Sequence, residues 1–277
     1  MKFSIILQTR NRFMQLERMI NSCLQTVSNQ DNLEFIIFVD NDDSTVYSFP
    51  HKNIKFIKGP RQWSTLRLNF ASNFATGDVL MYAADDITFE STHWDLKIEK
   101  LIQNNGIPCQ LITPSDNTCY SGVLATHGFV TREFREALGY FLPPYFPETY
   151  PDTWISEIAK LAKCFFYEPD VKIIHHHYRQ GNKLAVIDSL NVAKNQANIS
   201  RNPSLTYKKL HSERRYDALL LAIRNNINLE IKFKYLFGDL LVKILRLEVD
   251  NPKYFRLRCI GNLGVLRIFM RKIIGIN

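Results

Sequence analysis

Two adjacent carboxylates, Asp85 and Asp86, directly follow a short apolar run at residues 79–84. Hard divalent cations bind carboxylate oxygens and can bridge them to phosphates. The like charges of two neighbouring carboxylates are also costly unless a cation offsets them. The pair therefore indicates a divalent-cation site, although a solvated acidic turn or a helix N-cap would use the same residue type.

Two further polar clusters follow apolar runs in the same way. One comes shortly after residues 3–7 and contains two arginines, and the other comes directly after residues 34–39 and is rich in aspartate. An aspartate in such a position often only caps the next helix, so each cluster alone is a weak signal. The residues of these two clusters that matter most below are Thr9, Arg10, Asn11, Arg12, Asp40 and Asp42.

The apolar runs that precede the clusters alternate with helical stretches. The predicted strands are residues 3–7, 34–39, 54–57 and 79–84, and the predicted helices are residues 13–26 and 64–74. Continuous apolar strands separated by helices predict a mainly parallel sheet that is covered on both faces. In such sheets ligands bind beyond the carboxyl ends of the strands. We therefore expect the three polar clusters to meet at one edge of the sheet.

The charge of the chain is unevenly distributed. The 277 residues carry a formal net charge of +8, yet residues 201–277 hold 16 Lys/Arg and 6 Asp/Glu, so the first 200 residues carry a net −2. This pattern argues against a nucleic-acid-binding protein and predicts a local anionic partner for the C-terminal part. Basic amphipathic patterns at residues 232–247 and 263–276 favour an anionic membrane surface, with a homo-oligomer interface or intramolecular packing as alternatives.

The cysteines and the apolar segments bear on location. Five scattered cysteines without a CxxC pair favour a reducing compartment. The apolar start at residues 3–7 is too short for the core of a signal peptide, and the sequence lacks a stretch of about 18 uncharged apolar residues that could span a bilayer. We therefore expect a cytoplasmic protein whose basic end could rest on the inner face of the membrane.

Taken together, the motifs resemble those of glycosyltransferase family 2 in order and spacing. The matching segments of the first part of the chain are residues 4–12 (SIILQTRNR), 38–44 (FVDNDDS), 69–78 (NFASNFATGD) and 82–86 (YAADD). They correspond to the opening strand and loop of that family, its nucleotide loop, the stretch before its metal motif, and its D-x-D-type motif. The agreement extends over about 85 residues.

The resemblance continues through residues 132–141 (REFREALGYF), 150–154 (YPDTW) and 167–177 (YEPDVKIIHHH). It implies the GT-A fold, an α/β, Rossmann-like and mainly parallel sheet flanked by helices. On this basis residues 1–185 would form a nucleotide-sugar-binding and catalytic domain. Residues 186–277 would form a helical, basic C-terminal segment that makes acceptor, membrane or oligomer contacts.

The resemblance also implies a metal site. Asp86, at the position of the D-x-D-type motif, and His175, at the end of the last core strand, would bind Mn²⁺ or Mg²⁺, with Asp85 alongside. Alternation along a strand places His175 and His177 on one face and His176 on the other. His175 is the first choice among the three histidines and His177 the second.

Other matching residues would bind the donor or activate the acceptor. Asp40 would accept hydrogen bonds from the base or ribose, and Asp152 would be the general base. Guanidinium groups match the geometry of phosphates, so Arg10, Arg12 and Arg61 would contact the diphosphate. The full set assigned to donor binding is Thr9, Arg10, Asn11, Arg12, Asp40, Asp42, Arg61, Asn69 and Asp85.

These assignments predict a metal-dependent, inverting glycosyltransferase that moves a sugar from a nucleotide-sugar donor, with UDP as the first choice, to a hydroxyl of a surface glycan or glycolipid. A retaining transferase on the same fold is an alternative, because stereochemistry depends on the geometry of the cleft. A nucleotidyltransferase is disfavoured because residues 8–12 lack a glycine. A catalytically inactive sugar-nucleotide-binding or membrane-scaffold protein is a further alternative, since Pro151 precedes Asp152 where an acid is expected and Glu148 is the nearest acid.

Overall fold

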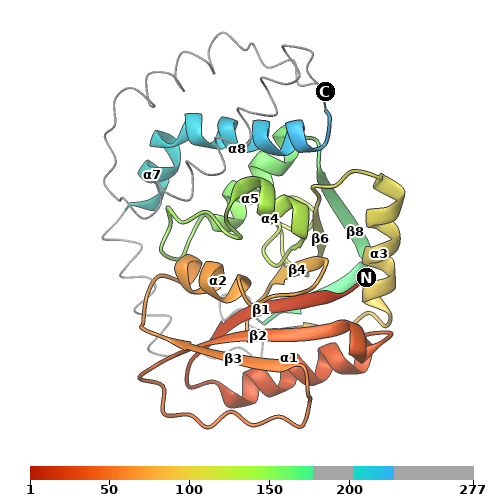
Figure 1. Cartoon of the computed structure of the whole chain (residues 1–277), viewed down its shortest axis with the longest axis vertical. Coiled ribbons are helices and arrows are strands. Elements are labelled where there is room, and N and C mark those ends of the chain that lie inside the picture. Colours follow the sequence, from red (N-terminus) through yellow and green to blue (C-terminus); the bar gives the residue numbers. More distant parts are fainter. Residues whose placement is uncertain (177–201, 228–277) are drawn as a thin grey trace.

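Eight β-strands form one sheet within residues 1–176 and 202–227, the parts of the chain that the computed structural model describes (Figure 1). The strands are β1 (Phe3–Thr9), β2 (Leu33–Asp40), β3 (Ile54–Gly59), β4 (Val79–Tyr82), β5 (Ile87–Phe89), β6 (Leu111–Ser115), β7 (Phe129–Thr131) and β8 (Phe165–His175). The α-helices are α1 (Phe13–Thr26), α2 (Ser64–Ser72), α3 (Trp94–Asn105), α4 (Arg132–Leu138), α5 (Pro151–Leu161), α7 (Pro203–Lys209) and α8 (His211–Arg224). The strand order is β3-β2-β1-β4-β7-β6-β8-β5.

The first half of the sheet is parallel. β1 pairs with both β2 and β4, and β2 pairs with β3 on its other side. These strands are built from largely apolar residues, as expected for strands that are covered on both faces. The predicted α/β architecture, with a sheet flanked by helices, is confirmed. The carboxyl ends of β1, β2 and β4 lie side by side, so the three polar clusters do meet.

The second half of the sheet is mixed. β7 pairs in antiparallel fashion with β4 and β6, β8 pairs in parallel with β6, and β5 pairs in antiparallel fashion with β8. β5 and β7 have three residues each, which is too short for a clear periodicity in the sequence. Their pairing has a functional consequence, because it places Ile87, next to Asp86, opposite His175.

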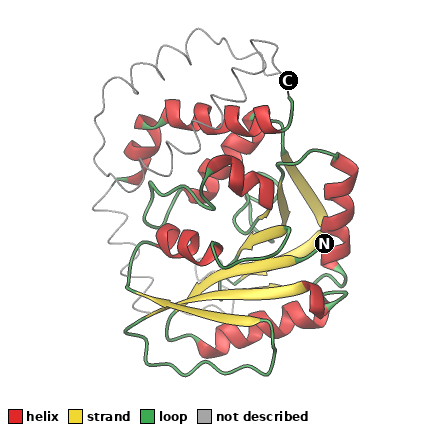
Figure 2. Ribbon diagram, in the orientation of Figure 1, coloured by secondary structure: helices red, strands yellow, loops and turns green. Residues whose placement is uncertain are grey.

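Helices lie on both faces of the sheet (Figure 2), and alternate strand residues supply an apolar core on each face. Ile6 and Leu80 belong to the core that α2, α4, α5 and α8 cover. Ile5 and Met81 belong to the core that α1 and α3 cover. With both faces occupied by helices, the strand ends are the places where polar side chains can gather.

α7 and α8 are the described part of the predicted helical C-terminal segment. α8 contributes Ala218, Leu221 and Ala222 to the core that it shares with α4 and α5. The basic amphipathic stretches at residues 232–247 and 263–276 lie outside the described residues. Within residues 1–176 and 202–227, none of the helices is both long and apolar enough to cross a bilayer.

Asn69, which was assigned to donor binding, connects α2 to the chain that follows α4. Its side-chain nitrogen donates to the carbonyl oxygen of Leu142 at 2.7 Å. Its Oδ1 accepts from the backbone N–H groups of Phe141 at 2.6 Å and Leu142 at 3.0 Å. Asn69 therefore holds the loop that leads to α5 against α2.

We expect Asn69→Ala to lower the free energy of unfolding by about 1–3 kcal/mol, because three polar groups of the loop backbone lose their partner. Urea denaturation measures this change. Asn21→Ala is a matched control, since Asn21 is exposed on α1, and it should change stability by about 0.5 kcal/mol or less. If Asn69→Ala instead lowered the affinity for the donor without lowering stability, the Asn69 side chain would be a donor-binding residue.

Candidate active site

Asp85 is held in place by residues from the end of β1. Thr9 Oγ1 donates to Asp85 Oδ2 at 2.8 Å, and Arg12 Nη1 donates to Asp85 Oδ1 at 3.0 Å. All three side chains are buried. The contact follows from the parallel pairing of β1 and β4, which brings the segments after these strands together. The structure thus unites three of the residues that the sequence assigned to this site.

Burial raises the pKa of Asp85 above its usual value, and the charge of Arg12 offsets only part of this effect. The neighbouring charge of Asp86 raises the pKa further, whereas the hydrogen bonds from Thr9 and Arg12 lower it. Asp85 is therefore a buried carboxylate whose ionised form depends on Arg12. Removal of one partner from such a pair leaves an uncompensated buried charge.

Asp86 contacts His175. The distance from His175 Nε2 to Asp86 Oδ1 is 3.3 Å, and the antiparallel pairing of β5 with β8 creates it. His176 donates its backbone N–H to the Asp86 carbonyl and places its ring against Thr88, with 2.9 Å between Nε2 and Oγ1. The two rings therefore lie on different sides of the strand, as alternation predicts, and His177 lies outside the described residues.

His127 also lies beside these residues, and no sequence pattern selected it. Its ring packs edge-on against the ring of His175, with 4.6 Å between the centroids. Burial raises the pKa of Asp86, but the hydrogen bond from His175 and the charges of His175, His127 and Arg12 outweigh burial, so the pKa lies well below its usual range. The proximity of His127 depends on the antiparallel pairing of β4 with β7, which local patterns do not reveal.

Asp86 and His175 fit a divalent cation. In an octahedral site with bonds of about 2.1 Å, neighbouring ligand atoms lie roughly 3 Å apart, close to the separation of these two atoms. Within the described residues, no group of three or more His, Cys, Asp or Glu side chains is arranged to hold an ion. A cation held by Asp86 and His175 would complete its shell with other oxygen ligands such as water and substrate oxygens, which is common for Mg²⁺ at phosphate sites.

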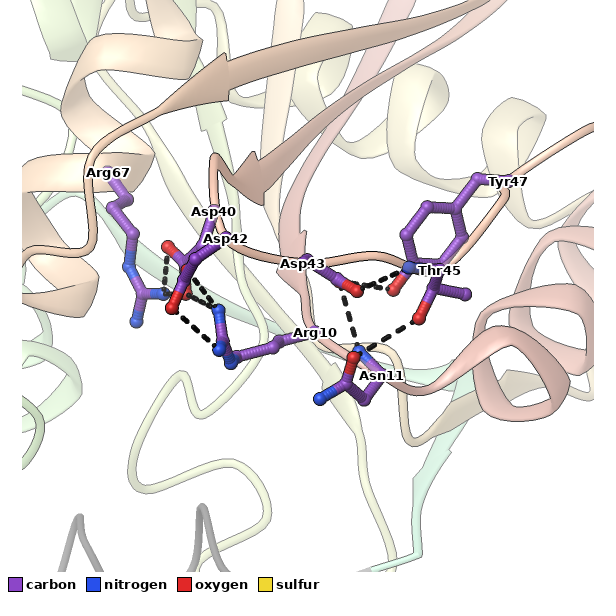
Figure 3. Close-up of polar contacts among 8 residues, drawn as sticks. All are labelled: Arg10, Asn11, Asp40, Asp42, Asp43, Thr45, Tyr47 and Arg67. Carbon is purple, nitrogen blue, oxygen red and sulfur yellow. Dashed lines mark hydrogen bonds and ion pairs between the residues drawn. The ribbon is translucent and has the colours of Figure 1, made fainter.

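A second charged cluster lies at the end of β2 (Figure 3). Asp40 is buried and accepts from Arg67 Nη1 at 3.0 and 3.2 Å and from Arg10 Nη1 at 3.3 Å. Arg10 also binds both carboxylate oxygens of Asp42, with Nη2 at 2.9 Å from Oδ2. Arg67 was missed by the sequence analysis. A buried aspartate requires a counter-charge, but the sequence does not tell which arginine supplies it.

Asn11 is part of a network that fixes the loop after β2 (Figure 3). Its backbone adopts a left-handed conformation with φ of 54°, which asparagine tolerates better than most residues. Its N–H donates to Asp43 at 3.1 Å, and its side-chain oxygen accepts from Thr45 at 3.2 Å. Asp43 also accepts from Tyr47 at 2.8 Å. The two loops that border the expected nucleotide site are therefore joined.

Arg61 lies close to this cluster, although its side chain is exposed. The hydrogen bond from Arg10 lowers the pKa of Asp42, and the charge of Arg61 adds to that effect. Arg61 is therefore near enough to Asp42 for its charge to act on that carboxylate.

Asp152 lies in the first turn of α5 and is half-buried. Burial raises its pKa above the usual value, and hydrogen bonds from Thr153 only partly counter this. Burial also raises the pKa of Tyr82, and the charge of Asp152 contributes to that rise. Tyr82, the last residue of β4, packs in the apolar core that α5 helps to cover, so Asp152 lies near the end of β4.

We expect Arg12→Met to lower the free energy of unfolding near neutral pH by about 3–5 kcal/mol, because Asp85 stays buried without its counter-charge. The substitution raises the pKa of folded Asp85 further above that of the unfolded chain. The loss should therefore be largest above the folded pKa and shrink as the pH falls toward the usual aspartate range. Denaturation curves across this range, repeated in an Asp85→Asn background, check the origin of the effect. An equal loss in both backgrounds would show that Arg12 stabilises the fold through other contacts.

Comparison with known proteins identifies the fold. Neither a protein-family model nor a curated protein matches this chain. Residues 1–349 of TarS from S. aureus in complex with UDP-GlcNAc share 13% identity over 64% of this chain and 59% of that chain, with a TM-score of 0.50. The mannosyltransferase PcManGT from Pyrobaculum calidifontis, in complex with GDP-Man and Mn²⁺, shares 12% identity over 100% of this chain and 88% of that chain, with a TM-score of 0.50.

GalNAc-T7 with UDP, GalNAc and Mn²⁺ shares 14% identity over 63% of this chain and 43% of that chain, with a TM-score of 0.51. The chain thus spans about 60% of the length of the TarS structure that it matches. At such low identities the likeness concerns the fold, and it agrees with the observed sheet topology. This chain has the GT-A glycosyltransferase fold.

Proposed function

We propose that this protein is a metal-dependent glycosyltransferase that moves a sugar from a nucleotide-sugar to a hydroxyl of a surface glycan or glycolipid, with inversion at the anomeric carbon. The observation that carries the proposal is the position of the Asp86–His175 pair beside Asp85 and Arg12, on a fold whose solved neighbours hold nucleotide-sugars and Mn²⁺. We propose Asp152, near Tyr82 at the end of β4, as the base.

The loops after β1 and β2 would bind the donor. Asp40 offers carboxylate oxygens for the base or ribose, and Arg10 and Arg67 fix its position. Arg10, Arg12 and Arg61 supply guanidinium groups that match phosphate oxygens. We propose UDP as the nucleotide, because UDP or UDP-GlcNAc is present in the TarS and GalNAc-T7 structures, whereas PcManGT holds GDP-Man.

Asp86 and His175 would hold Mn²⁺ or Mg²⁺, with Asp85 alongside. When bound, such a cation neutralises the negative charge that develops on a departing diphosphate. Asp85 does not contact His175 but keeps the backbone before Asp86 in place through Thr9 and Arg12. The pKa of Asp86 is low, so this side chain is ionised and ready to bind a cation at neutral pH.

Asp152 would act as the general base. It would accept the proton of the acceptor hydroxyl as that oxygen attacks the anomeric carbon and the diphosphate leaves. A raised pKa suits this role, because a base is most effective when its pKa approaches the working pH. Partial burial also helps to keep water away from the donor, which would otherwise be hydrolysed.

The membrane and oligomer contacts remain predictions. The basic stretches that favour the inner face of a membrane, or a second copy of the chain, lie outside the described residues. We propose that they bring the protein to a glycan or lipid-linked acceptor, because basic amphipathic helices bind anionic lipid surfaces.

We expect UDP-sugar to raise the melting temperature in the presence of Mn²⁺ and to have little effect in its absence. A ligand at 100 times its dissociation constant stabilises a protein by about 2.7 kcal/mol. Asp86→Asn should weaken the Mn²⁺-dependent binding by at least about 10-fold. Asp170→Asn, an exposed acid on β8, is the matched control and should bind as the wild type does. A panel with GDP, dTDP and CMP conjugates tests the base, and preference for another nucleotide would contradict the UDP assignment.

We expect Asp152→Asn to lower kcat by about 10²–10⁴-fold while leaving the donor dissociation constant unchanged. For the wild type, kcat/KM should fall as the pH decreases through the raised pKa of Asp152, so the loss should begin above the usual aspartate range. Steady-state kinetics with NMR analysis of the product tests rate and stereochemistry together.

Three results would contradict this assignment. Loss of transfer in Glu148→Gln, with full activity in Asp152→Asn, would make Glu148 the base. Retention of configuration would refute the inverting mechanism. Metal-dependent donor binding without any transfer would favour an inactive sugar-nucleotide-binding protein.

A further inference from the structure

We infer that α7 and α8 position the catalytic base, with Arg214 as the central positioning residue. This inference rests on the proposed function, because it takes Asp152 as the general base. The donor and metal residues assigned above come from β1, β2, α2, β4, β8 and the loops between them. α7 and α8 instead pack around the first turns of α5, which carries Asp152 (Figure 1).

Arg214 joins three helices. Its guanidinium carbon lies 3.8 Å from the centre of the Tyr207 ring on α7 and 5.4 Å from the centre of the Trp154 ring on α5. Its Nε lies 3.1 Å from Glu157 Oε2, also on α5, and its Nη1 donates to the Tyr207 carbonyl. The side chain is buried. Desolvated cation–π contacts and a charge-assisted contact together make Arg214 a specific link between α8 and α5.

Asp217 makes a second link between α8 and α5. Its Oδ2 accepts from Trp154 Nε1 at 3.1 Å and from the Tyr140 hydroxyl at 2.5 Å. Asp217 is only 1% exposed, so these hydrogen bonds form in a water-excluded setting. They fix the rotation of the Trp154 indole, two residues after Asp152.

Tyr150 is held on the other side of Asp152. It precedes α5 with φ of 78°, a left-handed conformation that is strained for a bulky residue. Its ring packs against Tyr207 of α7, with 5.2 Å between the centroids, and is stacked on Phe146 at 6.0 Å. Strained backbone persists only where its surroundings enforce it. The contact between Tyr207 of α7 and the Tyr150 ring helps to hold this strained backbone in place.

Tyr150 lies two residues before Asp152 in the sequence, and Trp154 lies two residues after it. Side chains of α7 and α8 thus hold both. A general base must lie within hydrogen-bond reach of the acceptor hydroxyl. A misplacement of about 1 Å can reduce a rate by roughly 100-fold. Loss of the Arg214 contacts should therefore impair the chemical step and spare the donor site.

The test compares Arg214→Ala with Arg215→Ala, a matched control at the adjacent, exposed arginine of α8. We expect Arg214→Ala to lower kcat by roughly 10–100-fold, with unchanged Mn²⁺-dependent affinity for UDP-sugar and unchanged donor KM. Arg214→Lys should recover part of kcat, since an ammonium group can still lie over the rings and reach Glu157. Arg215→Ala should behave as the wild type in both measurements.

Tyr207→Leu provides a second variant if Arg214→Ala does not fold, because it keeps an apolar group beside Tyr150 while removing the ring that Arg214 covers. Wild-type kcat in either folded variant would overturn the inference and leave the proposed function intact. A parallel loss of donor affinity would also overturn it, since it would show a general loss of structure. Absence of transfer by the wild type would instead refute the proposed function, and this inference with it.

Discussion

The burial of like-charged carboxylates at the carboxyl end of the sheet is the constraint on which the rest of the site depends. Parallel pairing of β1 with β2 and β4 brings three polar segments together, and helices on both faces exclude water from much of this edge. Each buried acid therefore needs a partner. Asp85 has Thr9 and Arg12, and Asp40 has Arg10 and Arg67. Arg12 balances the charge of Asp85, and Arg10 and Arg67 balance the charge of Asp40.

The same constraint explains why a cation suits the site. The charged side chains that contact one another there are Asp40, Asp42, Asp85, Asp86, Arg10, Arg12 and Arg67. At the end of β4 the two carboxylates of Asp85 and Asp86 share the guanidinium group of Arg12, so an excess negative charge is left there when His175 is neutral. A diphosphate would meet repulsion in such a cluster unless a divalent cation reversed the sign. The contact of Asp86 with His175 supplies ligand atoms at the point where that extra charge is needed.

The helices on both faces of the sheet position residues of the proposed reaction. α1 begins directly after the polar loop that follows β1, and its packing on one face sets the position of that loop. On the other face, α2 carries Arg67 to Asp40, and α5 carries Asp152 toward the end of β4. α8 closes this second face and contacts α5 directly. The face covered by α2 and α5 would thus contribute to both donor binding and base catalysis, whereas α1 on the opposite face positions the loop after β1.

Local patterns in the sequence were enough to predict the short-range features of the fold. The apolar runs predicted β1, β2, β3 and β4 within a few residues, and the amphipathic pattern predicted the exact bounds of α1. Strand ends follow from such local patterns, so the meeting of the polar clusters could be predicted. Only the tertiary structure decided what depends on contacts between distant segments. Arg67 pairs with Asp40, and Asn69 binds a loop backbone, because helix packing brings these segments together. His127 packs on His175 because antiparallel strand pairing brings them together. Helix packing and antiparallel pairing leave no periodic signal in the sequence.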